Sequence, residues 1–217
     1  MSDRESLRQR LGAGILDLHL TLDAAAIERL LDYVDLLVRW NAAYNLTAVR
    51  DPSDMVTRHL LDSLAIAPYV EGTTLADLGS GAGLPGIPLA IAAPEREILL
   101  VDSNGKKARF LREAVRKLGL AKTRVAESRV ESVEGTFDCI TARAFASLGE
   151  MLRWGGHLLA RGGRWLALKG RRPDDELGAL PEGFGVADIV ELRVPGLDAE
   201  RHLVIVRRTG TKVGSGS

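Results

Sequence analysis

The sequence predicts a doubly wound α/β fold with a mostly parallel sheet, preceded by a helical extension. Short apolar runs alternate with helical patterns from Thr74 onward, which is typical of a parallel sheet. A stretch with four glycines in eight residues, 79–86, joins the first apolar run to a helical pattern. The last two apolar runs follow one another without a helix between them, so we expect them to close the sheet as an antiparallel pair.

Composition places the chain among globular proteins, with 217 residues, 46% hydrophobic and 27% charged. A single cysteine, Cys139, excludes a disulfide framework, and its apolar surroundings predict a buried thiol. No apolar run approaches the roughly 20 residues of a membrane span. The N-terminal residues 1–5 are charged, with no apolar segment behind them. We therefore expect a cytoplasmic protein without a membrane association.

The charge is balanced overall but unevenly distributed. Residues 1–72 carry seven basic and eleven acidic side chains, whereas residues 103–124 carry eight basic side chains and one acid, Glu113. Clustered charge sets the local field, so the neutral total hides a basic face that suits a polyanionic partner.

The first part of the chain, residues 1–72, reads as a helical extension without a phosphate or metal motif. Apolar residues recur at three- and four-residue spacing over 3–18 and 24–40, with Thr21 or Asp23 as the cap of the second helix. Another helix starts near Asp51, with Ser53 as a candidate cap. We assign residues 73–209 to the sheet domain and the Gly/Ser-rich residues 210–217 to a flexible tail.

Within the sheet domain the pattern predicts seven strands and three main helices. The expected strands are 75–78, 98–101, 124–126, 137–141, 164–169, 186–192 and 203–206, and the expected helices are 87–91, 106–118 and 148–159. In such sheets ligands bind at the carboxyl ends of the strands, near the switch in strand order. We expect the first strand there, and the glycine stretch follows it directly.

The glycine stretch fits two cofactor motifs. Gly81-x-Gly83-x-x-Gly86, with Asp102 as the ribose acid, fits a dinucleotide fingerprint. Gly79-x-Gly81-x-Gly83 fits the loop of S-adenosylmethionine (SAM) methyltransferases.

Three features favour SAM over a nicotinamide cofactor or a purely structural turn. Asp77 precedes the glycines, where a carboxylate suits the ammonium of a methionine moiety and repels a pyrophosphate. The dinucleotide motif leaves Gly79-Ser80 unexplained. The closing antiparallel pair is the usual methyltransferase ending. The sequence therefore predicts a Rossmann-like, class I SAM-dependent methyltransferase sheet.

Other cofactor contacts are expected at the next strand ends. The Asp102 carboxylate can accept both ribose hydroxyls, or it can cap the helix that starts near Asn104. Backbone N–H groups of Val130 and Glu131 are placed to read adenine, with Leu84 on the apolar side; Glu131 is alternatively a solvated acid at a helix start.

The strand that ends near residue 141 is followed by Arg143 and Phe145. Amino-methylating enzymes often carry an Asn/Asp-Pro-Pro-aromatic motif there, so methylation of an exocyclic adenine amine is disfavoured.

Several longer runs resemble one family. They are Trp40-Asn41 with Asn45-Leu46-Thr47, His59–Leu64, Asp77–Leu89, Asp102-Ser103 with Lys106-Lys107 and Phe110-Leu111, Ser128–Glu131, Arg143–Leu148 and Leu168–Gly170. From about residue 36 to 172 the chain resembles the RsmG (GidB) family of bacterial 16S ribosomal RNA guanine-N7 methyltransferases. The Gly-Leu-Pro-Gly and Arg-Ala-Phe-Ala-Ser-Leu runs are more specific than the glycine loop alone.

The resemblance implies methylation of N7 of a guanine in the decoding-region loop of the small ribosomal subunit RNA. It implies cofactor contacts at Gly79, Leu84, Val130, Glu131 and Arg143, to which the residue patterns add Gly81 and Asp102. A methyltransferase for another RNA or a small molecule, a nicotinamide oxidoreductase and a non-catalytic RNA-binding regulator are the alternatives.

The substrate side is less defined by the sequence. Guanine N7 carries a free lone pair, so no general base and no metal is expected. Arg143 and Lys169 end strands on the cofactor side and are candidate RNA contacts; His59 and Asn45 are either structural or substrate-binding, and Phe145 either stacks on a base or packs in the core. Further phosphate-binding candidates are Lys106, Lys107, Arg109, Arg112, Arg161, Arg164, Arg171 and Arg172. We expect a monomer whose partner is the small ribosomal subunit.

Overall fold

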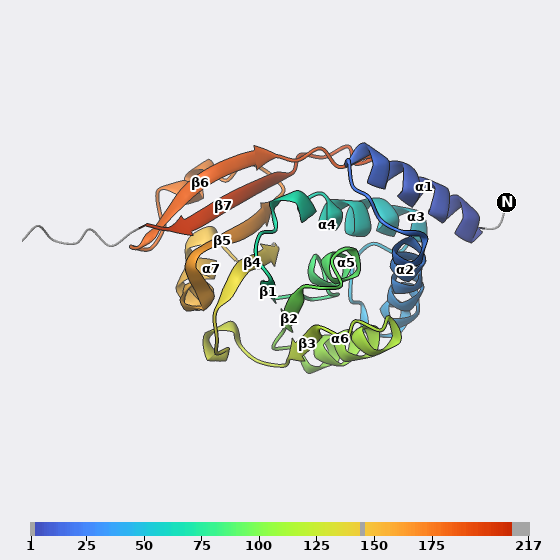
Figure 1. Ribbon diagram of the computed structural model, residues 1–217, viewed down its shortest axis with the longest axis horizontal. Helices are drawn as coiled ribbons and strands as arrows, with labels where there is room; N and C mark the ends of the chain where they lie inside the picture. Colours follow the sequence, from blue (N-terminus) through green and yellow to red (C-terminus); the bar gives the residue numbers. More distant parts are fainter. Residues whose placement is uncertain (1–2, 144–145, 210–217) are drawn as a thin grey trace, which may run out of the picture.

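A computed structural model describes residues 3–143 and 146–209, and in this part of the chain seven strands form one sheet (Figure 1). The spatial order is β3-β2-β1-β4-β5-β7-β6. Strands β1 to β5 are parallel, and β7 is antiparallel to both β5 and β6, which confirms the predicted mostly parallel sheet with its closing pair. The strands are β1 Thr74–Leu78, β2 Glu97–Val101, β3 Thr123–Ala126, β4 Phe137–Arg143, β5 Leu159–Lys169, β6 Phe184–Glu191 and β7 His202–Arg208.

Apolar residues alternate between the two faces of the sheet, because successive side chains of a strand point to opposite sides. Leu75 and Leu100 belong to the core under helices α5 (Gly86–Ala92) and α6 (Gly105–Lys117). Ala76 and Val101 belong to the core under α7 (Leu148–Gly155). Cys139 is a buried free thiol, as predicted.

The N-terminal helices share one of these cores. They are α1 Asp3–Asp17, α2 Ala24–Tyr44, α3 Pro52–Met55, the π-helix η1 Val56–Leu61, α4 Asp62–Leu64 and the 3₁₀ turn η2 Ala67–Tyr69. Leu30, Val34 and Leu37 of α2 are fully buried in the same cluster as Leu75 of β1. Helix α2 packs on α5 and α6, so the extension covers this layer of the fold (Figure 1).

Helix ends follow local hydrogen bonds. Asp23, one of the two predicted caps of α2, accepts a hydrogen bond from the Ala26 N–H. The prediction of Ser53 as a cap is wrong: Asp51 accepts from the backbone N–H groups of Ser53 and Asp54. Pro52 lacks an N–H and suits the first helical position, which moves the cap to the preceding residue.

The largest departure from the predicted boundaries in the second half lies between α7 and β5. The helix predicted over 148–159 ends at Gly155, and a 3₁₀ turn, η4 Gly156–Leu158, leads directly into β5. Strand β5 therefore begins before Arg164, and its pairing with β4 shifts register between Phe137 and Cys139. The remaining short helices are η3 Val130–Ser132 and α8 Asp174–Leu177. In the described part of the chain no helix has the length and apolar character needed to cross a membrane.

Candidate cofactor and substrate sites

The glycine loop leaves β1 at the switch in strand order, since β1 lies between β2 and β4. Gly79, Gly81 and Gly83 all have positive φ angles, of 69°, 59° and 89°. L-residues with a Cβ rarely adopt this region, so the loop needs glycine at these positions. The Ser80 hydroxyl donates to the Asp77 carbonyl and accepts from the Val101 N–H, which fastens the loop to β1 and β2.

Asp77 holds this loop from below and does not face a ligand. Its side chain is fully buried, and its two carboxylate oxygens accept hydrogen bonds from the Gly86 N–H at 3.1 Å and the Thr141 hydroxyl at 3.0 Å. Burial raises the pKa of this carboxyl to about 6. The expectation that Asp77 meets a methionine ammonium is therefore wrong. A Cβ on Gly86 would lie 2.7 Å from an Asp77 oxygen, so only glycine fits there.

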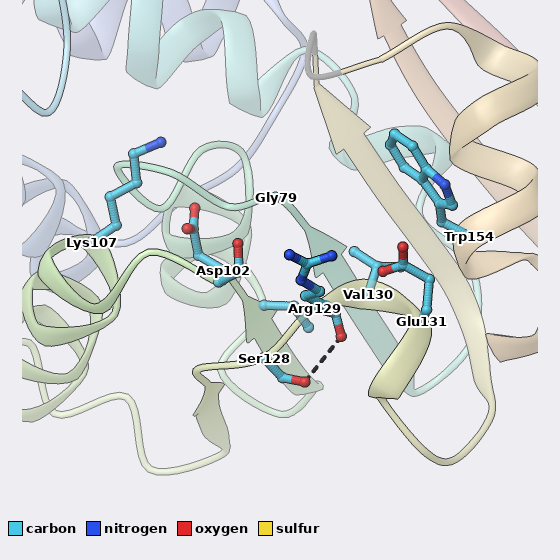
Figure 2. Close-up of a pocket in the computed structure, with 10 residues that line it drawn as sticks. Gly79, Asp102, Lys107, Ser128, Arg129, Val130, Glu131 and Trp154 are labelled. Atoms are coloured by element: carbon cyan, nitrogen blue, oxygen red, sulfur yellow. Dashed lines mark hydrogen bonds between the residues drawn. The ribbon is translucent and has the colours of Figure 1, made fainter.

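A cavity of about 390 Å³ opens at the carboxyl ends of β1, β2 and β3 (Figure 2). We name it the glycine-loop cavity. It brings together four predicted cofactor residues, Gly79, Asp102, Val130 and Glu131. Lys107 of α6 and Trp154 of α7 lie on opposite sides of it (Figure 2). The remaining lining residues are Val101, Ser103, Ser128 and Arg129.

Asp102 is fixed between the loop and α6. One carboxylate oxygen accepts from the Gly81 N–H at 2.9 Å and the other from the Asn104 N–H at 2.8 Å. Asn104, and not Asp102, caps α6 by accepting from the N–H groups of Lys106 and Lys107. A carboxylate has about four acceptor positions, so these two bonds leave acceptor capacity at the cavity wall.

The other predicted cofactor residues lie elsewhere. Gly81 does not line the cavity but donates its N–H to Asp102, which does, and Leu84 is buried in the core under α5 and α6. Trp154 was not predicted from the sequence. Its place on a short amphipathic helix that follows a strand end is the pattern that would have indicated a residue at the cavity. Lys107, predicted as a phosphate contact, lines this cavity.

A second cavity of about 300 Å³ lies at the ends of β4 and β5, and it collects the predicted substrate residues Arg143, Lys169 and His59. We name it the Asp62 cavity. Arg143 lines this cavity and is absent from the lining of the glycine-loop cavity. The full lining is Val49, Arg58, His59, Asp62, Arg143, Leu168, Lys169, Gly170 and Arg201.

A buried carboxylate organises this second cavity. Asp62 accepts from Arg143 at 3.1 Å through one oxygen and from Arg201 at 2.8 Å through the other. Its side chain is 4% exposed, whereas both arginines remain about a quarter exposed. Lys169 donates to both carboxylate oxygens of Glu176, at 3.0 and 2.8 Å. The cations are thus held in place around the cavity.

His59 lies on the π-helix η1, a rare conformation that is frequent at functional sites. Its Nε2 is 2.9 Å from the Thr47 hydroxyl, while Nδ1 has no hydrogen-bond partner in the described structure. Burial, followed by the charge of Arg143, lowers the pKa of His59 to about 4, so its ring is neutral at pH 7. Asn45 ends α2 in a left-handed conformation and accepts from Arg50. Phe145 lies outside the described residues.

The helical extension also contacts the cofactor loop directly. Tyr33 of α2 is fully buried, and its hydroxyl donates to the Ala82 carbonyl at 2.5 Å. Its ring lies 6.4 Å from that of Phe110 in α6. The extension therefore both covers the sheet and fixes one carbonyl of the glycine loop.

A family model described as rRNA small subunit methyltransferase G (GidB) matches residues 26–204. Proteins named ribosomal RNA small subunit methyltransferase G are close relatives over most of the chain. One from Xanthomonas euvesicatoria is 58% identical over 87% of this chain and 90% of its own, and one from Stenotrophomonas maltophilia is 59% identical over 85% and 88%. The chain belongs to the GidB family.

Solved structures place this GidB-family chain in the methyltransferase fold. The ribosomal protein L11 methylase of Lactobacillus delbrueckii is 20% identical, with a TM-score of 0.54 over 69% of this chain and 77% of that one. The glycopeptide N-methyltransferase MtfA, solved with S-adenosyl-L-homocysteine, is 10% identical, with a TM-score of 0.60 over 70% and 87%. These similarities confirm the predicted class I fold.

Proposed function

We propose that this chain transfers the methyl group of SAM to N7 of a guanine in the RNA of the small ribosomal subunit. The observation that carries this proposal is the match to rRNA small subunit methyltransferase G over residues 26–204, in a chain whose glycine-loop cavity lies at the switch in strand order. The guanine and its N7 atom come from the family resemblance of the sequence.

The donor set of the glycine-loop cavity fits SAM. Asp102 can still accept hydrogen bonds from a ribose diol. The 3₁₀ turn η3 begins at Val130 and Glu131, whose backbone N–H groups would contact adenine. When bound, SAM supplies an electrophilic methyl group on a sulfonium. We propose that Gly79, Asp102, Val130 and Glu131 hold it, that Gly81 and Leu84 shape the loop, and that Arg143 lies between cofactor and substrate.

The residues of the site have to position the guanine rather than move a proton. Guanine N7 carries a lone pair and loses no proton on methylation, so the reaction requires alignment in place of a general base. The pKa of about 4 makes His59 a neutral group at pH 7, which fits a binding role. Asp77 is sealed beneath the loop and takes no part in proton transfer.

We place the RNA on the side of the Asp62 cavity, with Arg143, Lys169 and His59 as its contacts. This cavity lies at the ends of β4 and β5, next to β1, from which the glycine loop departs. The basic residues of α6 extend the cationic surface toward the glycine-loop cavity: Lys106 is exposed, and the half-buried Lys107 lines the cavity. We further propose that the protein acts in the cytoplasm, as a monomer, on the small ribosomal subunit or its RNA.

The test is a transfer assay with SAM that carries a labelled methyl group. Small ribosomal subunits from cells that lack this protein are compared with protein-free 16S RNA and with transfer RNA, and the RNA is digested to nucleosides. We expect 7-methylguanosine from small-subunit RNA in at least one of its two forms. Label in another nucleoside, or in transfer RNA only, would contradict the proposal.

A further inference from the structure

The Asp62 cavity carries more positive charge than its carboxylates neutralise. Arg58, Arg143, Lys169 and Arg201 line it, while Asp62 is the one acid among its described lining residues and Glu176 pairs with Lys169 from the side. Four cations therefore face two carboxylates. Arg58 is exposed at the rim, and within residues 3–143 and 146–209 no carboxylate pairs with it. Such an imbalance attracts an anionic ligand.

His59 also lines this cavity, and its buried Nδ1 has no hydrogen-bond partner among the described residues. The Thr47 hydroxyl oxygen already accepts from the Val49 N–H, so its hydrogen is available to His59 Nε2. When this hydroxyl donates to Nε2, the ring proton lies on Nδ1, which burial leaves without a side-chain partner among the described residues, and His59 is only 3% exposed. An unpaired buried donor costs free energy, which an acceptor atom of a ligand would recover.

The chemistry of the proposed reaction separates two possible occupants, a base and a phosphate. Methylation at N7 leaves a positive charge on the purine. A guanine inside this cavity would acquire that charge among four cations, and Coulomb repulsion would oppose the transfer. A phosphodiester carries a permanent negative charge and several acceptor oxygens, which match arginine side chains and an imidazole N–H.

We propose that the Asp62 cavity binds a backbone phosphate of the substrate RNA, which orients the neighbouring guanine toward the glycine-loop cavity. Arg58 and the Nδ1 of His59 contact the phosphate, together with Arg143 and Arg201, which Asp62 holds at fixed positions. The inference rests on the proposed function, because it takes the RNA substrate from it.

The experiment measures binding of small ribosomal subunits, purified from cells that lack this protein, at several salt concentrations and without SAM. Arg58→Gln should weaken binding about tenfold near 0.1 M salt, and it should reduce the slope of log affinity against log salt by about one, as expected for the loss of one phosphate contact. Arg58→Lys keeps the charge and should stay within about threefold of the wild type. Arg201→Gln should reproduce the smaller slope from the other side of the cavity.

Arg207→Gln is the matched control, because Arg207 is an exposed arginine toward the opposite end of β7 from Arg201 and should leave the slope unchanged. An unchanged slope in both Arg58→Gln and Arg201→Gln would overturn the proposal. Altered preference for the target base at an unchanged slope would also overturn it, since that result assigns the cavity to the base. If Arg58→Gln and Arg201→Gln reduce the slope as expected but the wild-type protein transfers no methyl group, the result contradicts the proposed function and still supports the phosphate site.

Discussion

The two cavities are built by different means. The glycine-loop cavity is organised by the backbone of the glycine loop and by Asp102, which is bonded to N–H groups of Gly81 and Asn104; Lys107 and Trp154 flank it. The Asp62 cavity is shaped by long cationic side chains from η1, β4 and the segment before β7. The first therefore offers a ligand a fixed backbone shape and hydrogen bonds. The second offers positive charge, and its geometry depends on Asp62.

Two buried acids, Asp62 and Asp77, show the same difference. Asp77 accepts hydrogen bonds from neutral groups and has a raised pKa, because the cost of burying its charge outweighs these hydrogen bonds and the attraction of Arg143. Asp62 pairs with two arginines. The first acid joins backbone segments around the loop, while the second acid positions charges. Substitutions of Asp77 and Asp62 therefore test separately how the backbone of the loop is fixed and how the charges of the second cavity are positioned.

The largest effect is expected from Asp62→Asn. The substitution leaves Arg143 and Arg201 without their shared carboxylate, and loss of one partner of a buried ion pair costs about 4 kcal/mol. Urea unfolding should show this decrease in the free energy of unfolding. Asp174→Asn is the control, because its pair with Arg172 is exposed and should contribute less than about 1 kcal/mol. Equal effects of the two substitutions would show that Asp62 does not organise the cavity.

A pH-dependent effect of about 2 kcal/mol is expected at Asp77. Its pKa rises from 3.8 to about 6 on folding, so its contribution to stability is present below the unfolded pKa and is lost as the pH rises through 6. Asp77→Asn should therefore gain about 2 kcal/mol of unfolding free energy relative to the wild type between pH 4.5 and pH 7. His59, whose pKa falls to about 4, has the opposite dependence, and the comparison of the two proteins removes it. A constant difference between the two proteins would contradict the assignment.

A smaller effect is expected from Tyr33→Phe, which removes one hydrogen bond to the Ala82 carbonyl. One such bond contributes about 1 kcal/mol, so affinity for SAM should fall about fivefold in calorimetry. The rate constant at saturating SAM should stay unchanged, because the substitution acts on the loop and not on the RNA side. Tyr44→Phe, at an exposed position in the same helix, is the control. Unchanged SAM affinity in Tyr33→Phe would show that the extension does not set the loop conformation.

Residues that act next to strand ends were predictable from the sequence. Gly79, Asp102, Val130 and Glu131 each follow a strand of the sheet, and parallel strands bring their carboxyl ends to one edge. The prediction for Asp77 was wrong because successive residues of a strand point to opposite faces of the sheet. The spacing between Asp77 and the glycines does not show that its side chain is buried against Gly86 and Thr141.

The Asp62 cavity was only partly predictable. His59, Arg143 and Lys169 were singled out, but Asp62 and its partner Arg201 are 139 residues apart, and no local pattern links them. Trp154 was missed for a related reason, since the packing of α7 on the sheet decides which side of that helix faces the cavity. Contacts of this kind follow from the tertiary structure.

We propose that the glycine-loop cavity holds SAM independently of the Asp62 cavity beside it. Calorimetric titration with SAM of the wild type, Asp102→Ala, Arg58→Gln and the double variant tests it directly. We expect about a hundredfold loss of SAM affinity in Asp102→Ala, wild-type affinity in Arg58→Gln, and no further loss in the double variant. Wild-type SAM affinity in Asp102→Ala would show that Asp102 does not hold SAM, and a comparable loss in Arg58→Gln would show that the two cavities are not independent.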